Sequence, residues 1–532
     1  MQVNVDKYFA VLRKIRALAA ILIALLLVLT FVYFKVSQNW VKSANLKGEE
    51  AFLKGAIGTE VMPLVVLDVL PDMFPENFQP AGVEAGDWID QFGFIRDPKN
   101  EALPVGFTLS NRRPKSGAPS PVPFVALTCA LCHSTEIQPV GTNETHFIIG
   151  PGNRSLNLFS WLDAFQASIL DEEKLTLETL EGAYHEKHGR KYTLSEKLMT
   201  RLWLNGIRKS IGAGLPRFDE PFGHGKSRDP SIVAAGPTRT FPFRTIVRSA
   251  LNRPGEKMAV YTKISTIYLQ KNRRWAQVDG SINDIDLRSA TAAFAAGATV
   301  QNLKIPEIAN TVKEASKFTE TLQGPPYAKL FPAQAALSDP DLVERGRQLY
   351  MTSCNSCHGH RTSDGLGWVN GARHGEIIPL EEIGTDPERV VFRHYERITA
   401  KLVELFQEPH PFPMAPENLR APNEVEKRGY VAAPIETAYL RAPYLHNASV
   451  MTLAELINLQ PRRTKFYRGR NAYDPENVGF ISPAEPNEFV YFEFDTSLRG
   501  NSNKGHDYPW SYDDPDRDPA ELKALLAYLK TL

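Results

Sequence analysis

The sequence predicts a mainly α-helical protein with two domains, long loops and one N-terminal transmembrane helix. An uninterrupted apolar run occupies residues 17–34, and several later segments repeat apolar residues at helical spacing. A proline-containing connector at 324–340 separates the helical segments into two groups. A chain of 532 residues is also too long for one compact core and suggests about two to four domains.

The composition is that of a globular protein. The chain is 43% hydrophobic and 23% charged, and its 61 basic residues balance 61 acidic ones. A nucleic-acid-binding protein normally carries a basic surplus on one face. We therefore expect no nucleic-acid partner.

The apolar run at 17–34 contains no charged residue, and as a helix it would span about 27 Å, close to the hydrocarbon thickness of a bilayer. Four basic residues precede it: Lys7, Arg13, Lys14 and Arg16. The positive-inside rule then places residues 1–16 in the cytoplasm and everything after Lys35 outside. A cleaved signal peptide is the alternative, but no small-x-small site follows the run. We expect a single-pass protein of the bacterial inner membrane with its body in the periplasm.

Composition shifts divide the rest of the chain. Residues 35–57 are largely polar and are expected to form a stalk. The region 59–124 is rich in Pro, Gly and Asp, which predicts irregular chain wrapped on a core. The connector at 324–340 then separates a first domain at 58–330, which contains insertions, from a second domain at 331–532.

Apolar periodicity predicts the main helices, at 156–170, 194–211, 285–298, 342–351 and 520–532. Glycine and proline clusters at 212–237 predict a long loop, and long ordered loops are often functional.

All four cysteines lie in two CxxCH motifs, Cys129-Ala130-Leu131-Cys132-His133 and Cys354-Asn355-Ser356-Cys357-His358. In such a motif two thiols three positions apart reach the two vinyl groups of one haem, and the adjacent imidazole falls under the iron. A zinc site would need further Cys or His partners at close spacing. The motifs therefore predict two covalently bound haem c groups, with His133 and His358 as iron ligands.

The second motif has the helical surroundings of a cytochrome c domain. The helix predicted at 342–351 runs directly into Cys354, and the one at 520–532 follows far downstream. In cytochrome c domains two such helices cross closely, with a glycine on one against an aromatic residue on the other. Gly346 and Tyr528 are the candidates for this contact.

The sixth iron ligands are less determined by the sequence. Five other histidines are candidates: His146, His360, His410, His446 and His506. His506 is favoured for the second haem, because it lies in a glycine-containing loop just before the last helix and cytochrome c domains often supply this ligand from their C-terminal half. Met414 and Met451 remain alternatives, since thioether ligation is common in cytochromes c.

Several segments carry a family resemblance. Arg441-Ala442-Pro443-Tyr444-Leu445-His446-Asn447-Ala448-Ser449-Val450-Met451-Thr452-Leu453 resembles the APYxHxGS-x-xTL signature of the di-haem cytochrome c peroxidase superfamily, with Ala448 in place of the usual glycine. Residues 466–480, 500–506 and 275–281 are most similar to the branch that contains the bacterial rubber oxygenases. The resemblance covers residues 85–532.

The resemblance implies unequal haems. Ordinary peroxidases of this superfamily place a methionine ligand fourteen positions after the signature histidine, where this chain has Gln460. The oxygenase-like branch instead uses a glycine-histidine near the C-terminus, which His506 matches. The second haem is then expected to be bis-histidine, suited to electron transfer. The first haem, on His133, would be the reactive one, with His146 either a displaceable distal ligand or, as we favour, a strand residue beside the haem.

The resemblance also implies roles around the first haem. Residues 214–224 resemble a family segment near that haem, and they offer Arg217, Asp219 and Glu220 for proton transfer or for polarising peroxide. A surface loop with salt bridges is the competing interpretation. Trp275 is expected between the haems, where it either relays electrons or simply packs. A calcium ion between the domains, known in some relatives, stays open.

Three functional hypotheses follow. The first is a peroxidase-like or oxygenase-like oxidoreductase that takes peroxide or dioxygen at the first haem and electrons from a periplasmic or membrane donor. The second is an electron-transfer cytochrome without chemistry of its own. The third is a protein-modifying di-haem enzyme, a reading that weakens if His506 is an iron ligand. Rubber cleavage does not follow from family likeness, because fold does not fix function.

Overall fold

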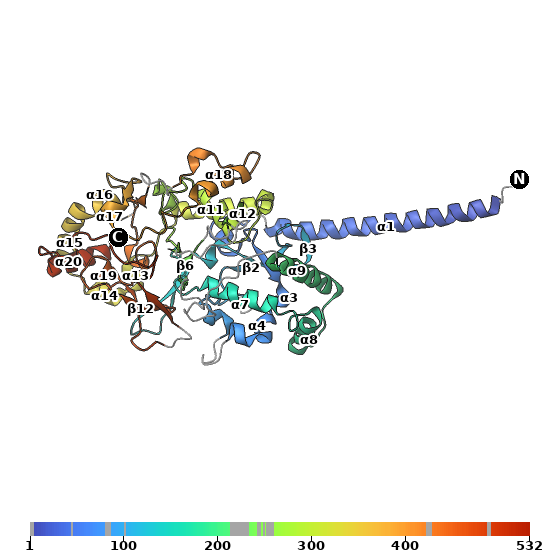
Figure 1. Ribbon diagram of the computed structural model, residues 1–532, viewed down its shortest axis with the longest axis horizontal. Coiled ribbons are helices and arrows are strands. Elements are labelled where there is room, and N and C mark those ends of the chain that lie inside the picture. Colours follow the sequence, from blue (N-terminus) through green and yellow to red (C-terminus); the bar gives the residue numbers. More distant parts are fainter. Residues whose placement is uncertain are drawn as a thin grey trace.

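The computed structural model shows an elongated body from which one long helix projects (Figure 1). It describes the whole chain apart from residues 1–4, 44–45, 80–86, 100–102, 213–232, 242–245, 248–249, 252–259, 366, 422–427 and 487–490.

The projecting helix is α1 (Val5–Ser43). Its stretch Phe9–Val32 has a mean hydropathy of 2.8, and none of it is buried against the body. Within the described residues, no other helix is long and apolar enough to cross a membrane. A helix of this kind near an N-terminus is either a membrane anchor or a signal sequence.

The region 35–57 was expected to form a stalk, but it contains the end of one helix and a second helix that packs into the body. The helix α1 continues through Ser43, and α2 (Gly48–Lys54) buries Ala51 and Phe52 against α12 (Pro306–Thr321). Two buried side chains on a seven-residue helix are enough to fix α2 in the body, although the sequence around them is polar.

An antiparallel sheet leads into the first CxxCH motif. Its strand order is β1-β3-β2, with bounds Glu60–Pro63 for β1, Phe107–Arg112 for β2 and Pro119–Leu127 for β3. The expectation of irregular chain at 59–124 was therefore wrong here. Alternating prolines at 119, 121 and 123 argue against a central strand. However, they lie in the half of β3 that β1 does not pair with, so only one edge needs donors there.

Further elements complete the N-terminal half of the body. Its short helices are α3 (Leu64–Leu67), α4 (Leu70–Met73), α5 (Pro75–Phe78) and α6 (Trp88–Gln91). Its longer helices are α7 (Leu158–Leu170), α8 (Leu177–His188), α9 (Leu194–Gly212) and α11 (Ile285–Ala295). Its other strands are β4 (Ser134–Pro139), β5 (His146–Ile149), β6 (Arg239–Thr240) and β7 (Thr262–Lys263).

The C-terminal half consists of short elements joined by long loops. Its helices are α13 (Tyr327–Leu330), α14 (Pro332–Ala336), α15 (Pro340–Ser353), α16 (Asn355–His358), α17 (Leu380–Ile383), α18 (Tyr395–Leu405), α19 (Leu453–Leu456) and α20 (Pro519–Leu529). Its strands are β8 (His360–Arg361), β9 (Trp368–Val369), β10 (Ile377–Pro379), β11 (Gly429–Val431), β12 (Lys465–Arg468), β13 (Ala472–Asp474), β14 (Gly479–Phe480) and β15 (Phe492–Asp495).

The helices α15 and α20 cross closely beside the second CxxCH motif. A Cβ atom on Gly346 would lie only 1.9 Å from the carbonyl oxygen of Ala524, so no side chain fits between the two backbones. The ring of Tyr528 packs at 5.1 Å from the ring of Tyr350. The expected crossing is present, but Gly346 meets backbone, and the aromatic contact is to Tyr350.

A mixed sheet joins the two halves and corrects the predicted fold class. Its strand order is β14-β13-β4-β5, and β13 runs parallel to β4, pairing Tyr473 with Pro139. Overall the structure is 42% helical and 14% strand. The expectation of a mainly α protein with two cytochrome c-like domains was therefore wrong. The three-residue strand β13 pairs with a strand more than 300 positions away, and so short a strand leaves no periodic signal in a sequence.

Candidate haem sites

The first CxxCH motif follows directly from the β1-β3-β2 sheet. Thr128 follows β3 and caps a single helical turn, its hydroxyl oxygen accepting from the Ala130 amide at 3.3 Å. Gly106 lies so close to this turn that a Cβ atom there would be 2.2 Å from the Cα atom of Leu131. The sheet and the close backbone approach together fix Cys129, Cys132 and His133 in one short turn.

His133 is oriented by its second ring nitrogen. Its Nδ1 lies 3.0 Å from the carbonyl oxygen of Ser265, which makes Nδ1–H the donor and leaves Nε2 free as a ligand. Burial lowers the pKa of His133 to about 3, so the imidazole stays neutral, as metal ligation requires. A neutral, oriented imidazole beside two cysteines fits covalent haem c.

A cavity of about 1450 Å³ opens in front of Cys129, Cys132 and His133. Pockets that hold one small molecule measure about 300–1,000 Å³, so there is room for a haem and a further guest. Most of the described walls are apolar, among them Phe159, Trp161, Leu162, Phe165, Met199, Trp203, Phe241 and Phe294. No second histidine occurs among the described residues that line it.

The apolar walls are interrupted by five charged side chains among the described residues: Glu60, Arg113, Lys115, Lys263 and Arg288. Arg288 of α11 lines the cavity near Cys129, and burial lowers the pKa of its guanidinium to about 10. Glu60 of β1 is buried, and its Oε1 accepts from the Ser110 hydroxyl at 2.8 Å. Its Oε2 has no hydrogen-bond partner among the described residues, and burial raises the pKa of the carboxyl. Glu60 therefore holds a proton more readily than an exposed carboxyl does.

Sequence reasoning did not identify Glu60 or Arg288. Both lie far from the CxxCH motifs along the chain, and Glu60 falls in a segment that was read as irregular. One signal was present: Glu60 stands in an otherwise apolar stretch at 61–67, and an acidic residue beside buried chain often needs a partner or a function.

The second motif begins where α15 ends. Its turn is α16, and the Nδ1 of His358 lies 2.8 Å from the carbonyl oxygen of Ala433, so this imidazole too presents Nε2. The ring of His506 lies opposite, with ring centroids 6.0 Å apart. An imidazole nitrogen binds a metal at about 2 Å, so one metal between two facing imidazoles puts the ring centres about 6 Å apart. The separation fits a shared iron.

The loop that carries His506 is held by backbone contacts. The His506 amide donates to the Ile383 carbonyl at 2.7 Å. Gly505, at φ +78°, packs against Gly384, where an added Cβ atom would be 2.2 Å from the Gly384 carbonyl carbon. The guanidinium of Arg462 donates to the carbonyls of Asn503 and Gly505. These contacts aim the ring of His506 at His358.

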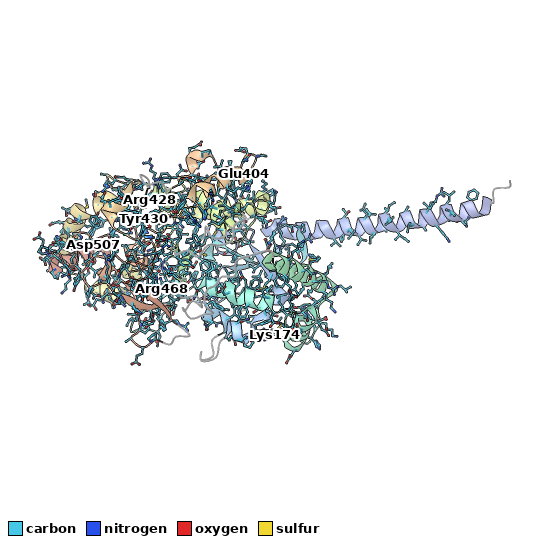
Figure 2. The ribbon with its side chains drawn as sticks, viewed as in Figure 1. Lys174, Glu404, Arg428, Tyr430, Arg468 and Asp507 are labelled. Atoms are coloured by element: carbon cyan, nitrogen blue, oxygen red, sulfur yellow. The ribbon has the colours of Figure 1, made fainter. Side chains whose placement is uncertain are left out.

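The electrostatics of this pair also suit ligation. Burial lowers the pKa of His506 to about 3 and lowers the pKa of His358, so both imidazoles are neutral. Met414 and Met451, the alternative ligands, are buried in two separate hydrophobic clusters of the described residues. Figure 2 shows Asp507, the neighbour of His506, at the end of the body opposite to α1.

Buried cations gather between the two motifs. Arg441 and Arg273 share the carboxylate of Glu436, at 3.0 Å and 2.7 Å. Arg154 donates to the carbonyls of Ile264 and Leu440, and Lys263 donates to those of Arg441 and Pro443. Burial lowers the pKa of Arg154, Lys263 and Arg441.

This cluster has a surplus of positive charge. Among the described residues named above, four basic side chains stand against one carboxylate, that of Glu436, which contacts only Arg273 and Arg441 of the four. The Nε atoms of Arg154 and Arg273 have no hydrogen-bond partner there. Unpaired buried charge is costly, so the cluster calls for anions. The propionate groups of haem are anions of suitable size, and the donor set therefore fits a haem on either side.

The other predicted site residues are placed as follows. His146 lies at the start of β5 with its Nδ1 3.7 Å from Glu144, and it is not among the described residues that line the first cavity. Trp275 donates to the Gly375 carbonyl at 3.1 Å, while its neighbour Ala276 lines the first cavity. Arg217, Asp219 and Glu220 lie outside the described residues.

A calcium site has no support from clustered ligands. Among the described residues, no group of three or more His, Cys, Asp or Glu side chains is placed to hold a metal ion. Haem iron needs only one axial side chain on each face, so the same observation does not bear on the haem sites.

Comparison with known proteins agrees with part of this picture. Residues 48–133 match a family described as a Y4iN-like domain, and residues 429–468 match one described as RoxA-like, cytochrome c-like. The chain is 26% identical over 531 residues to the uncharacterized protein y4iJ of Sinorhizobium fredii, covering 84% of this chain and 85% of that protein. It is 27% identical over 337 residues to y4iM of the same organism, covering 56% and 71% respectively.

The first family match contains the first CxxCH motif, whereas the second covers a segment between the second motif and His506 and contains neither of them. The Y4iN-like match ends at His133, and the RoxA-like match contains Arg441, Tyr444 and His446. The second match supports a cytochrome c-like relationship, which implies haem c as the cofactor.

Proposed function

We propose that this chain is a membrane-anchored, periplasmic di-haem c-type cytochrome that acts as an oxidoreductase. Cys129, Cys132 and His133 would hold the reactive haem, and Cys354, Cys357, His358 and His506 the electron-transfer haem. The proposal places the chain near the rubber-oxygenase-like branch of the di-haem cytochrome c peroxidase superfamily.

The asymmetry between the two histidines carries the proposal. His358 has a facing imidazole at 6.0 Å, whereas His133 faces a cavity of about 1450 Å³ without a second histidine among its described walls. An iron with two imidazoles has no free position for a substrate, whereas one with an open side does. The first site is thus suited to chemistry and the second to electron supply.

Haem iron, when bound, supplies redox chemistry toward peroxide or dioxygen. Reduction of hydrogen peroxide to two water molecules takes up two electrons and two protons. The protein residues supply the environment: the apolar walls exclude bulk water, Arg288 provides a positive charge beside Cys129, and Glu60 holds a proton inside the cavity. A periplasmic or membrane-bound donor would supply the electrons.

Trp275 supports electron passage between the sites. Its ring bonds to Gly375, and the Arg373 amide nearby bonds to Ser356 within the second motif, while Ala276 reaches the first cavity. The segment is anchored by Asp279, which forms a buried ion pair with Arg389 at 2.7 Å. We infer that Trp275 lies on the route between the haems.

Electron paramagnetic resonance of the purified full-length protein tests the proposal. The resting protein should show one low-spin haem whose signal does not change when hydrogen peroxide or dioxygen is added. It should also show one high-spin or readily exchanged haem whose signal does change. Two low-spin, unresponsive haems would exclude the enzyme and leave the electron-transfer reading. A tyrosine-ligated second haem would favour the protein-modifying reading.

A further inference from the structure

A stripe of leucines on α9 is exposed. Leu194, Leu198 and Leu202 are 87%, 55% and 47% exposed, and their spacing of four residues puts them on one face of the helix. The opposite face is buried through Met199, Trp203 and Leu204. A surface helix normally turns polar residues outward, so an apolar outer stripe indicates a surface that meets something other than water.

The helices α9 and α1 both contact β3, and both are at the same end of the body in Figure 1. The helix α1 also contacts β2 where it joins the body. Its apolar stretch ends at Val32 and the helix ends at Ser43, so these last eleven residues span about 16 Å. If α1 crosses the membrane, the face that carries α9 lies within roughly that distance of the bilayer surface.

The same helix forms one wall of the first cavity. Met199, Trp203 and Ile207 line it from the buried side, and Leu202 and Gly206 line it while also being exposed. The turn between β2 and β3, residues 113–116, lines the cavity as well, and its Lys115 contacts Ser210 of α9. The cavity therefore reaches the surface between α9 and this turn.

Basic residues flank the leucine stripe. Arg201 and Lys209 are exposed on the same face of α9, and Lys115 is exposed on the turn. Nearby carboxylates are already paired: Glu196 with Arg190 and Glu181 with Lys197, each at 2.9 Å. Leucines flanked by Lys and Arg are the pattern of helices that lie in the headgroup region of a bilayer containing anionic lipids.

We propose that α9 rests in the headgroup region of the membrane, and that the first cavity takes an apolar or amphiphilic molecule directly from the bilayer. The guest enters between Leu202, Gly206 and the turn at 113–116, and it occupies the cavity volume that a haem leaves open. This inference rests on surface and cavity geometry, so it holds whether or not the first haem reacts with peroxide.

Spin labelling of the full-length protein in bilayer nanodiscs tests the docking. With both haems attached, none of the four native cysteines is free, so a single added cysteine carries the label. Leu198→Cys is the test site, and Leu337→Cys is the control, because Leu337 is 86% exposed in the half of the body that is remote from α1. The label at 198 should be more accessible to oxygen than to a water-soluble nickel chelate, and the label at 337 should show the reverse.

Two results would overturn the docking. A label at 198 that behaves like the label at 337 places α9 in water. A label at 198 shielded from both reagents places it against protein, such as a second copy of this chain. Oxygen accessibility several-fold above that of the control is the supporting result.

Photolabelling tests the entry of a guest. Full-length protein in phosphatidylethanolamine and phosphatidylglycerol vesicles is irradiated with a diazirine-bearing palmitic acid, and the labelled residues are mapped by peptide mass spectrometry. We expect label on cavity residues such as Phe165 and Trp203 in addition to α1. Gly206→Trp should reduce the cavity label at least fivefold, because the indole would fill the opening.

Gly182→Trp on α8 is the matched control. Both glycines are exposed helix positions with nothing within 4 Å of an added Cβ atom, so neither substitution disturbs packing. Gly182→Trp should leave the cavity label unchanged. Label confined to α1, or equal cavity label in Gly206→Trp and wild type, would overturn the route. The haem spectra of all variants report the proposed function separately, because they do not depend on the photolabel.

Discussion

The histidine of each CxxCH motif is oriented by an atom that the motif itself does not contain. The carbonyl oxygens of Ser265 and Ala433 accept the Nδ1–H of His133 and His358, so both rings present the same nitrogen. The two sites differ only in what lies opposite, which is an imidazole for His358 and an apolar cavity for His133. If each motif binds a haem, as we propose, the chemical difference between the two haems would originate in residues distant from either motif.

His506→Met should change the second haem and leave the first unaltered. Thioether ligation raises the reduction potential relative to bis-histidine ligation, so we expect a higher potential for one haem in a redox titration. His360→Met is the control, because the His360 ring already bonds to Asn355 at 2.7 Å. Identical spectra for His506→Met and wild type would mean that another residue binds the iron.

Glu60→Gln should alter how stability depends on pH. Burial raises the pKa of Glu60 in the fold above its ordinary 4.5, so the folded protein retains a proton that the unfolded chain releases. The carboxyl therefore costs nothing below about pH 4.5, and wild type loses stability as the pH rises from there toward the folded pKa. Each unit of raised pKa costs about 1.4 kcal/mol.

Urea unfolding between about pH 4 and pH 7 measures this difference. As the pH rises, the free energy of unfolding of Glu60→Gln should increase relative to that of the wild-type protein. Peroxide turnover should fall by about 10²-fold if Glu60 moves a proton. A pH-independent difference between the two proteins would show that the fold does not raise the pKa of the Glu60 carboxyl.

The helices and strands of this fold differ in how well they can be predicted from the sequence. The segment 194–211 became α9 almost residue for residue, because nineteen residues with a repeating buried face leave a strong periodic pattern. The strands β13 and β4 left none, since their pairing depends on tertiary contacts between Tyr473 and Pro139. His506 could be proposed as a ligand from its glycine neighbour and family likeness, whereas only the fold shows that Glu60 lines the same cavity as His133.

The crossing of α15 and α20 should be intolerant of any side chain at Gly346. Gly346→Leu would force the helices apart at Ala524, and overpacking of this kind costs about 1–3 kcal/mol. Gly182→Leu on α8 is the control, since its Cβ meets open space. Chemical denaturation followed by circular dichroism should show a loss only for Gly346→Leu, and equal stability of both variants would contradict the tight crossing.

The close contact between Gly505 and Gly384 should fix the position of the neighbouring His506. Gly505→Ala adds a Cβ atom 2.2 Å from Gly384 and should displace His506, giving a high-spin second haem in the optical spectrum. Gly365→Ala has a similar φ, +73° against +78°, but open space around its Cβ atom. It should carry the same backbone cost and keep the low-spin spectrum, so a high-spin signal in both variants would point to general destabilisation.

At the scale of the whole molecule, the two candidate sites lie one after the other along its long axis (Figures 1 and 2). The first cavity is bounded by α9 and the β2–β3 turn near the base of α1, and the His506 loop lies at the opposite end (Figures 1 and 2). The mixed sheet and the cluster around Glu436 connect them. The sequence predicted one haem site in each of two domains, and it gives no sign of the pairing between Tyr473 and Pro139 that joins the two halves.

Trp275→Phe should slow electron passage along this axis. Phenylalanine keeps the packing but loses the indole and its bond to Gly375, so we expect about a tenfold slower inter-haem step, equivalent to about 1.4 kcal/mol in barrier. Rapid-mixing absorption measurements after reduction of the second haem follow the step. Trp510→Phe, a half-buried tryptophan near Asn458, should leave the rate unchanged. Equal rates in both variants would assign Trp275 a packing role.

The surplus of buried cations around Glu436 has a consequence for how the protein is made. Before haem attachment, Arg154, Lys263, Arg273 and Arg441 repel one another in a nearly dry interior, and this opposes closure of the chain between its two halves. Haem propionate groups, which are negatively charged, would replace this repulsion with attraction and so favour closure of the chain. Haem attachment and folding would then be linked. We expect a chain without its haems to remain open and to be degraded by proteases before it accumulates.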